Sequence, residues 1–396
     1  MRSKIVILFL AVSFLVKAQD ELLIARTTGT KTLVDGTVIN TFGFAKRLSE
    51  NPNVPGPTLE FYEGDSVVID MWNVSQASTH TIHLHGLDVN QQNDGVPHLS
   101  FEVDHMEHGL YRFKAPHPGT YLYHCHVVSV LHVQAGMYGL LVIKPKGEEN
   151  MTWENGYKFR RAYNFLTSEI DTAWHSLDVL EHSYDHSAIA VPDYEPTYFL
   201  CNGLADSEYN FGDSLRFSTG ANSYLRFANI GYYGNRIILP KELNTKVIDS
   251  DGRPLPDVFD WDTIMIYPGE RYSVLVNPTV DFADSIKIEY VNMNTYQTQG
   301  INKLSFKTYN SAGIESHLKG NIKITPNPFY NELRISSINA FKGIELCDVL
   351  GNQILAESLT VCNEYRANTT SFRSGVYILK VKFLDGTSLS KKVIKY

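Results

Sequence analysis

Short runs of apolar and β-branched residues, separated by turns that contain Gly or Pro, recur along the chain and predict strands. One such turn, Glu63-Gly-Asp-Ser66, precedes the mostly apolar run Val67–Trp72. Another turn is predicted at Asn93-Asp-Gly-Val-Pro97. The 23 Tyr and 20 Phe residues also favour strands. We therefore expect an all-β protein built from β-sandwiches.

A second copy of the first pattern follows further along the chain. The paired segments are 65–73 with 222–229, 80–86 with 234–241, and 121–126 with 289–294. Every His and Cys in the segments of the first copy is replaced in the second. We therefore predict two sandwich domains, residues 19–147 and 148–310, and expect metal ligands only in the first.

The two ends of the chain have compositions of their own. Residues 1–18 combine a charged start, an apolar run too short to span a bilayer and a cleavage site after Ala18, which is typical of a signal peptide. Residues 318–396 carry a net charge of +5, so residues 1–317 carry −13 of the total of −8. This C-terminal module is predicted to be a small basic β-sandwich behind a linker at residues 311–317. The acidic remainder argues against nucleic-acid binding.

The stretch Tyr121–Tyr138 holds three histidines, one cysteine and one methionine. We interpret it as a strand that runs into a loop. Because side chains alternate along a strand, Cys125 should face one way and its two neighbouring histidines the other. A thiolate, imidazoles and a weak axial thioether are the ligands of blue-copper sites. Cys125, His132 and Met137 supply these types, and one more imidazole is needed.

A second predicted strand, His80–Gly86, supplies that imidazole. His83 and His85 share one face of it, whereas His80 lies on the opposite face. Pairing the two strands would bring His80 to Cys125 and would gather a quartet of histidines behind them. The quartet consists of His83, His85, His124 and His126. The sequence thus predicts two metal centres joined by the backbone of His124-Cys125-His126.

Three motifs in this region resemble those of the multicopper oxidases, over roughly residues 35–310. They are His83-Leu-His85-Gly86, Asp94-Gly-Val-Pro97 and Gly119-Thr-Tyr-Leu-Tyr-His124-Cys-His126. The resemblance implies two cupredoxin-like Greek-key β-sandwiches, the second of them metal-free. It implies a type 1 copper at His80, Cys125, His132 and Met137, and a type 2/3 copper centre at His83, His85, His124 and His126. It further implies that Asp94 helps to deliver protons, for which a plain turn residue is the alternative.

The resemblance also implies an activity, that of a secreted, laccase-like copper oxidoreductase. Electrons would pass from a small-molecule or metal-ion reductant through the type 1 copper to a second copper centre that reduces oxygen. A full cluster in this family uses eight histidines in four His-x-His pairs, whereas this chain has two pairs. Either a homo-oligomer brings two quartets together, or the second centre, mononuclear or multinuclear, holds fewer coppers.

Two other functions stay open at this point. One is a non-enzymatic blue-copper electron carrier or copper-binding protein. The other is an enzyme resembling the copper nitrite reductases, although their further ligand is missing where Asn292 or Asn294 stands.

The C-terminal module, from Ile324-Thr-Pro-Asn-Pro-Phe329 to its basic end, resembles the C-terminal sorting domain of the type IX secretion system. This implies the type IX secretion machinery as a partner and export to the cell surface or the medium.

Other histidines and cysteines lack the motif spacing. His98 and His117 are given no role. His105 and His108 could hold an extra metal, but a solvated position is favoured for them. A surface position is also favoured for His175, His182 and His186, with an accessory metal or substrate-entry site as the alternative. Cys201 is expected to be buried, and a disulfide between Cys347 and Cys362 is left open because spacing alone does not establish one.

Overall fold

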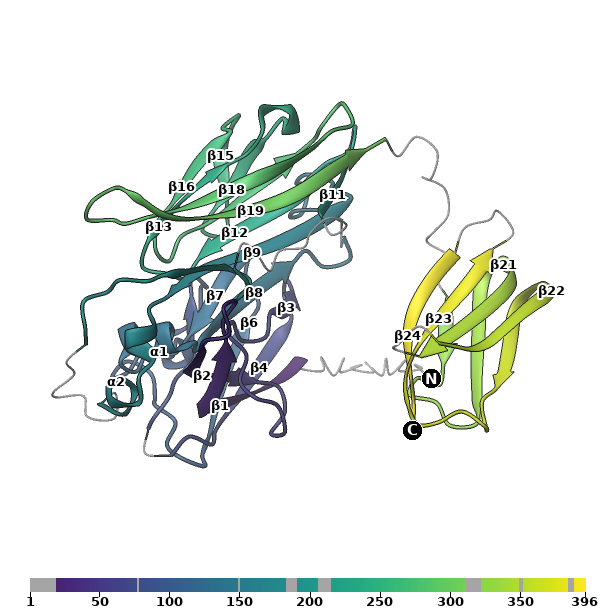
Figure 1. The fold of residues 1–396 in the computed structure, drawn as a ribbon, viewed down its shortest axis with the longest axis horizontal. Coiled ribbons are helices and arrows are strands. Elements are labelled where there is room, and N and C mark those ends of the chain that lie inside the picture. The colour runs from purple at the N-terminus through teal and green to yellow at the C-terminus, as the bar shows by residue number, and fades with distance from the viewer. Residues whose placement is uncertain are drawn as a thin grey trace, which may run out of the picture. The chain divides into compact units, whose positions relative to one another are not determined.

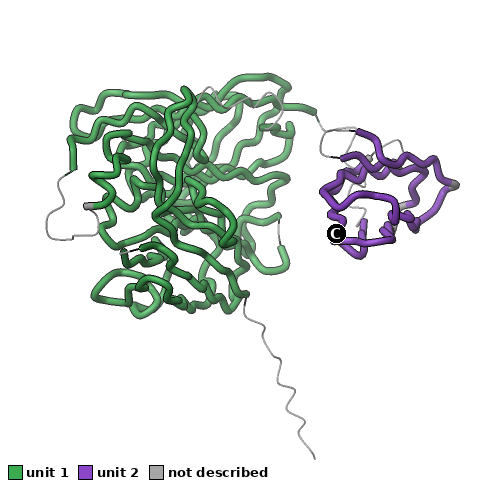
Figure 2. The backbone as a smooth tube through the Cα atoms, turned by 60° about the horizontal axis from the view of Figure 1, so that its bottom comes forward, with its two compact units in different colours: residues 1–310 green, residues 311–396 purple. Residues whose placement is uncertain are grey.

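The computed structural model is an all-β protein with few helices, and it divides into two compact units, residues 1–310 and 311–396 (Figures 1 and 2). It describes residues 19–76, 78–148, 150–182, 191–205, 215–310, 322–348, 352–383 and 388–396. The predicted signal peptide and linker lie outside these ranges. No helix in the described ranges is long and apolar enough to cross a membrane.

The first sandwich consists of two four-stranded sheets with the orders β2-β1-β4-β6 and β3-β8-β7-β5. The first sheet contains β1 (Gln19–Thr32), β2 (Val38–Ala45), β4 (Ser66–Asn73) and β6 (His108–Lys114). The second contains β3 (Leu59–Tyr62), β5 (His83–His85), β7 (Gly119–His124) and β8 (Tyr138–Lys144). Along β4 buried residues alternate with less buried ones, as a strand with one face on a core requires.

The second sandwich repeats this topology with additional strands. Its sheets have the orders β10-β9-β12-β17-β14-β15 and β11-β19-β18-β13-β16. The strands of the first are β9 (Arg161–Ile170), β10 (Tyr198–Cys201), β12 (Ser223–Asn229), β14 (Lys246–Ser250), β15 (Arg253–Phe259) and β17 (Arg271–Val276). Those of the second are β11 (Leu215–Ser218), β13 (Gly234–Ile238), β16 (Thr263–Ile266), β18 (Ala283–Val291) and β19 (Thr298–Tyr309).

Strand pairing relates the two sandwiches directly. The parallel pair β1 and β4 corresponds to β9 and β12, and the parallel pair β3 and β8 corresponds to β11 and β19. The antiparallel pair β5 and β7 corresponds to β13 and β18. In the first sandwich this pair places His83 opposite His124, whereas in the second it holds the ion pair Arg236–Glu289, with 2.8 Å between Nη1 and Oε2.

Each sandwich has its own core, and a third apolar cluster joins them. Leu122 and Leu140 of β7 and β8 pack in this joining cluster with Leu166 and Ala228 of the second sandwich. The Tyr138 hydroxyl also donates to Ser168 Oγ over 2.8 Å. Burial of each leucine side chain is worth roughly 2 kcal/mol, so the outer face of the β7 sheet is fixed against the second sandwich.

The C-terminal unit is a separate β-fold around its own apolar core, which includes Phe329, Leu333 and Phe341. Its strands are β20 (Lys323–Thr325), β21 (Glu332–Asp348), β22 (Gln353–Asn368), β23 (Gly375–Phe383) and β24 (Ser388–Lys395). Cys347 lies opposite Gln353, whereas Cys362 lies opposite Phe341. None of the four cysteines forms a disulfide in the structure, so the pairing of Cys347 with Cys362 that was left open above is not formed.

Candidate metal centres

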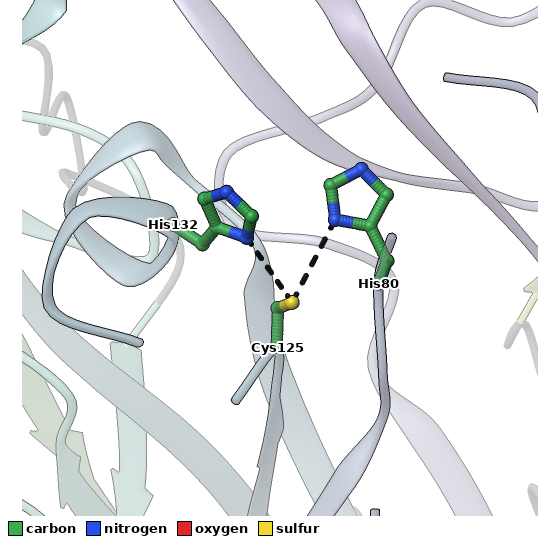
Figure 3. Close-up of side chains that lie close together, drawn as sticks. All are labelled: His80, Cys125 and His132. Atoms are coloured by element: carbon green, nitrogen blue, oxygen red, sulfur yellow. Dashed lines mark hydrogen bonds between the residues drawn. The ribbon is translucent and has the colours of Figure 1, made fainter. Parts of the chain in front are cut away.

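Cys125, His80 and His132 converge in the core of the first sandwich (Figure 3). Cys125 follows the end of β7, and its amide donates to the Met137 carbonyl over 3.0 Å. Its Sγ lies 3.3 Å from His132 Nδ1 and 3.7 Å from His80 Nδ1. All three side chains are fully buried. The structure therefore brings together these three residues, which the sequence predicted as ligands of one metal.

Two local details of this cluster differ from the prediction. His132 lies in a short helix, α1 (Ser129–Ala135), and not in a loop. The helix ends at Gly136, whose φ of 119° favours glycine, and its first turn carries His132 back towards Cys125. His80 lies outside β5, in an isolated bridge to Val103, because the regular strand covers only His83–His85.

Met137, the predicted axial ligand, is fully buried in the same apolar core as Cys125. Its amide donates to the His132 carbonyl over 2.9 Å, while its own carbonyl accepts from Cys125. The backbone of Met137 thus links the two other predicted ligands of this segment.

Ser75, which no sequence motif marks as functional, orients the His80 ring. The Ser75 hydroxyl donates to the Ala25 carbonyl over 3.3 Å, so it accepts from His80 Nε2–H over 2.9 Å. This arrangement assigns the tautomer and leaves His80 Nδ1 with a free lone pair towards Cys125. Burial also lowers the pKa of His80 well below its usual value and raises the pKa of the Cys125 thiol to about 11. A bound cation would favour the thiolate.

We expect Ser75→Ala to weaken metal binding at this cluster without changing its ligands. Loss of an orienting partner typically costs 10- to 100-fold in metal affinity, so a fall of about tenfold is expected. Competition titration with a copper chelator measures it. Ser78→Ala is the matched control, because the Ser78 hydroxyl contacts the Thr79 carbonyl rather than a histidine. Equal affinities of the two variants would contradict the role of Ser75.

The four other histidines form a second cluster behind Cys125. His83, His85 and His124 have ligand atoms within 4.8 Å of one another, and His85 Nδ1 lies 3.3 Å from His124 Nε2. The ring of His126 lies against that of His83, with 5.2 Å between centroids. The rings of His124 and His126 are stacked at 5.9 Å. The predicted quartet therefore comes together.

Hydrogen bonds and burial prepare these imidazoles to bind a cation. His83 Nδ1 donates to the Asp94 carbonyl over 2.8 Å and lies 3.4 Å from its carboxylate, and His124 Nδ1 donates to the Cys125 carbonyl over 2.9 Å. Burial lowers the pKa of His124 to about 3, and burial, with Arg271 nearby, lowers the pKa of His85 to about 4. Neutral imidazoles with free lone pairs are what transition metals require. Asp94 thus lies beside the quartet.

The second sandwich covers one side of this quartet, which the sequence did not indicate. A Cβ added to Gly269 would lie 3.3 Å from His85 Nε2, so the backbone of the second sandwich approaches the ring closely. The guanidinium of Arg271 is buried there and donates to the carbonyls of Thr120 and Gly269 over 3.2 and 2.8 Å. Asp251 pairs with Arg271 at 2.8 Å. Larger side chains at position 269 would therefore displace His85.

The remaining histidines take separate positions. His108 pairs with Asp70 at 2.8 Å and stacks on Trp72, while His105 Nδ1 lies 2.5 Å from the Ser75 carbonyl. His175 is not on the surface as expected: it is 2% exposed in a 3-10 helix (Thr172–His175), and its Nδ1 donates to the Asn40 carbonyl over 2.7 Å. His186 and the side chain of His182 lie outside the described residues.

The donor sets of both clusters suit copper. Two imidazoles and a cysteine thiol in a dry apolar core, which also buries the Met137 thioether, match the chemistry of blue-copper sites. A group of neutral imidazoles backed by a carboxylate matches a second copper centre. A double cupredoxin sandwich with these two clusters defines a copper redox protein.

Comparisons with known proteins identify the family. Two multicopper oxidase family models match residues 39–148 and 172–314, and a secretion system C-terminal sorting domain model matches residues 323–396. The chain belongs to the multicopper oxidase family and carries a sorting domain, and copper is its cofactor.

Curated relatives are distant. Copper resistance protein A of Pseudomonas syringae pv. tomato is 30% identical over 270 residues, which is 58% of this chain and 42% of that protein. Laccase 1 of Metarhizium acridum is 37% identical over 106 residues, 26% of this chain and 17% of that protein. The chain thus spans less than half the length of these relatives.

Solved structures share the fold. Blue copper oxidase from Nitrosomonas europaea superposes with a TM-score of 0.54 at 26% identity, covering 73% of this chain and 86% of that chain. Copper nitrite reductase from the same organism gives a TM-score of 0.55 at 19% identity, covering 74% and 95%. The second likeness shows the fold alone.

Proposed function

We propose that this protein is a copper-dependent oxidoreductase that takes electrons at the Cys125 cluster and reduces oxygen at the histidine quartet. One observation carries the proposal: Cys125 of the first cluster is covalently flanked by His124 and His126 of the second. A direct hydrogen bond, from His124 Nδ1 to the Cys125 carbonyl, adds a further connection. Copper at both clusters would supply a one-electron couple at each end of this link.

The residues around the two clusters have distinct tasks in this proposal. The cluster of Cys125, His80, His132 and Met137 excludes water, since all four side chains are fully buried. Three members of the quartet, His83, His85 and His126, are partly exposed, which suits a site that a small oxidant must reach. Asp94, bonded to His83 through its carbonyl and 30% exposed in its side chain, is placed to pass protons from solvent to the quartet.

The number of histidines limits how many coppers the second centre of one chain can hold. Four imidazoles are half of the eight that a complete cluster uses in this family. We propose that an oligomer completes the site, with the quartet of one chain meeting the second sandwich of a neighbour and about two coppers bound per chain. A meeting of two quartets would instead supply eight histidines and hold more copper.

The test combines copper content per chain, sedimentation equilibrium and oxygen uptake with several reductants. Close to two coppers per chain, an oligomer and oxygen consumption are expected. A monomer with one copper that consumes no oxygen with any reductant would contradict the proposed oxidase activity and would favour the function of a blue-copper electron carrier.

The sorting domain indicates type IX secretion and a cell-surface or secreted location. Because residues 311–396 form a compact unit with a core of their own, deleting residues 318–396 should leave both copper clusters intact. We expect the shortened protein to load copper normally but to be retained inside the outer membrane. Cell fractionation with immunodetection measures this, and normal appearance of the shortened chain in the medium would contradict it.

A further inference from the structure

A reductant cannot touch the ligands of the Cys125 cluster, because Cys125, His80 and His132 have no exposed surface. Electrons must therefore enter through protein groups that connect the cluster to the surface. Helix α1 carries His132 and leads outwards, since Val130 on the same helix is half exposed. The contacts of α1 with the second sandwich therefore show where an electron can enter.

Two tyrosines of the second sandwich bond directly to α1. The Tyr232 hydroxyl donates to the carbonyl of Val130, two residues before His132. Gln134, two residues after His132, donates its amide to the Tyr194 hydroxyl over 3.1 Å. The rings of Tyr194 and Tyr232 also touch each other, with 5.2 Å between centroids. These tyrosines are thus the aromatic groups that join α1 to the second sandwich.

The same two tyrosines line a surface cavity of about 520 Å³. We call it the tyrosine cavity, and its lining consists of Asp193, Tyr194, Glu195, Tyr232, Tyr233, Asn292, Met293 and Asn294. Residues 292–294 follow β18 directly, as Cys125 and His126 follow β7 in the first sandwich. The second sandwich therefore has a cavity at the end of the strand where the first has its metal ligands.

The lining selects for charge and shape. Three tyrosine rings offer flat apolar surface for a planar ring, and their faces attract cations. Asp193 and Glu195 are exposed acids, and no described lining residue is basic. Residues 1–317 as a whole carry a net charge of −13, which repels anions further.

The tyrosines are held in place from behind by a buried acid. Glu169, 2% exposed, accepts through Oε1 from the amides of Tyr232 and Tyr233 and from the Tyr194 hydroxyl, the last over 3.3 Å. Its backbone carbonyl accepts from Gln134 of α1 over 3.1 Å. Glu169 thus fixes the cavity wall to the helix that carries His132.

We propose that the tyrosine cavity is where a small, planar, neutral or cationic electron donor docks, and that Tyr232 connects it to the Cys125 cluster through Val130. With copper held by Cys125, His80 and His132, the step would be one outer-sphere electron transfer: the donor would lose one electron, the oxidised copper would gain it, and no bond would form or break. This inference rests on the proposed function, but docking itself needs no copper.

Docking is tested first, on the copper-free protein, with phenyltrimethylammonium as a planar cation that is not oxidised. Calorimetry should show one binding site, and benzenesulfonate of similar shape should not bind. The double variant Asp193→Asn/Glu195→Gln should bind the cation about five- to tenfold more weakly, as expected for two exposed charges. Absence of binding, or equal binding of the anion, overturns the docking site whatever the activity of the enzyme.

The connection is tested on the copper-loaded protein by stopped-flow bleaching of the blue absorption under anaerobic conditions, with an aromatic diamine as donor. Tyr232→Phe keeps the ring but loses the bond to Val130, so bleaching should slow several-fold while phenyltrimethylammonium binds as before. Tyr163→Phe is the matched control, because the Tyr163 hydroxyl also donates to a backbone carbonyl, that of Arg216 over 3.0 Å, but lies outside the cavity and does not contact α1. Equal rates for the two variants, or no slowing by added phenyltrimethylammonium, would overturn the role of Tyr232.

Discussion

The variant Cys125→Ser is expected to lose the intense visible absorption of the oxidised, copper-loaded protein completely. That absorption comes from charge transfer between a thiolate and copper, and a serine hydroxyl is too hard and too basic a donor to replace it. The two imidazole nitrogens near Cys125 would still converge, so weak copper binding can survive while the colour does not. Electron transfer from a reductant into the protein should be lost together with the visible absorption.

Cys201→Ser provides the control for this variant. Cys201 is also fully buried, but it lies in the second sandwich at the end of β10. Its replacement should leave the visible spectrum unchanged. A blue, fully loaded Cys125→Ser protein would remove Cys125 from the metal site, and loss of colour in both variants would indicate misfolding instead.

The sequence predicted the fold and the residues of both clusters because their signals are local. Cys125 lies in one cluster and its neighbours His124 and His126 in the other, and the period-two alternation of an extended chain predicts that separation. The repeat of the first sandwich is visible because strand positions keep their apolar character while the ligands disappear. Arg236 and Glu289 show this: they form an ion pair in the strand pair that corresponds to β5 and β7.

What the sequence could not predict depends on contacts between distant segments. Ser75 acts on His80 only because Ala25 of β1 fixes its hydroxyl, and nothing in the motif around His80 indicates this. His175 is buried because residues of the first sandwich cover it, whereas its own segment has the polar character of a surface loop. Helix α1 has only 7 residues and is too short for hydrophobic periodicity to reveal.

The position of the second sandwich against the quartet is the most important feature that the sequence did not predict. Gly269 lies in the turn before β17 and Arg271 begins that strand, and neither belongs to a metal-ligand motif, yet both lie close to His85 of the quartet. A domain that lost its copper ligands can still shape a copper site through backbone packing. The outcome of replacing a quartet histidine therefore reports on ligation and on this packing together.

For that reason the variant His85→Ala separates the two clusters most sharply. His85 lies on β5, outside the segment that carries Cys125, and its Nδ1 lies 3.3 Å from His124 Nε2. Removing it should leave the blue absorption intact but should reduce oxygen consumption by more than about 100-fold, beyond what loss of a merely supporting residue costs. The measurement is a cycle: a reductant bleaches the protein without air, and oxygen is then admitted. The parent protein should regain its colour, whereas His85→Ala should bleach and stay colourless.

His108→Ala provides the control. His108 is an exposed histidine of the same sandwich, paired with Asp70, and its replacement should behave like the parent. Recovery of colour and full oxygen uptake in His85→Ala would show that oxygen is reduced elsewhere.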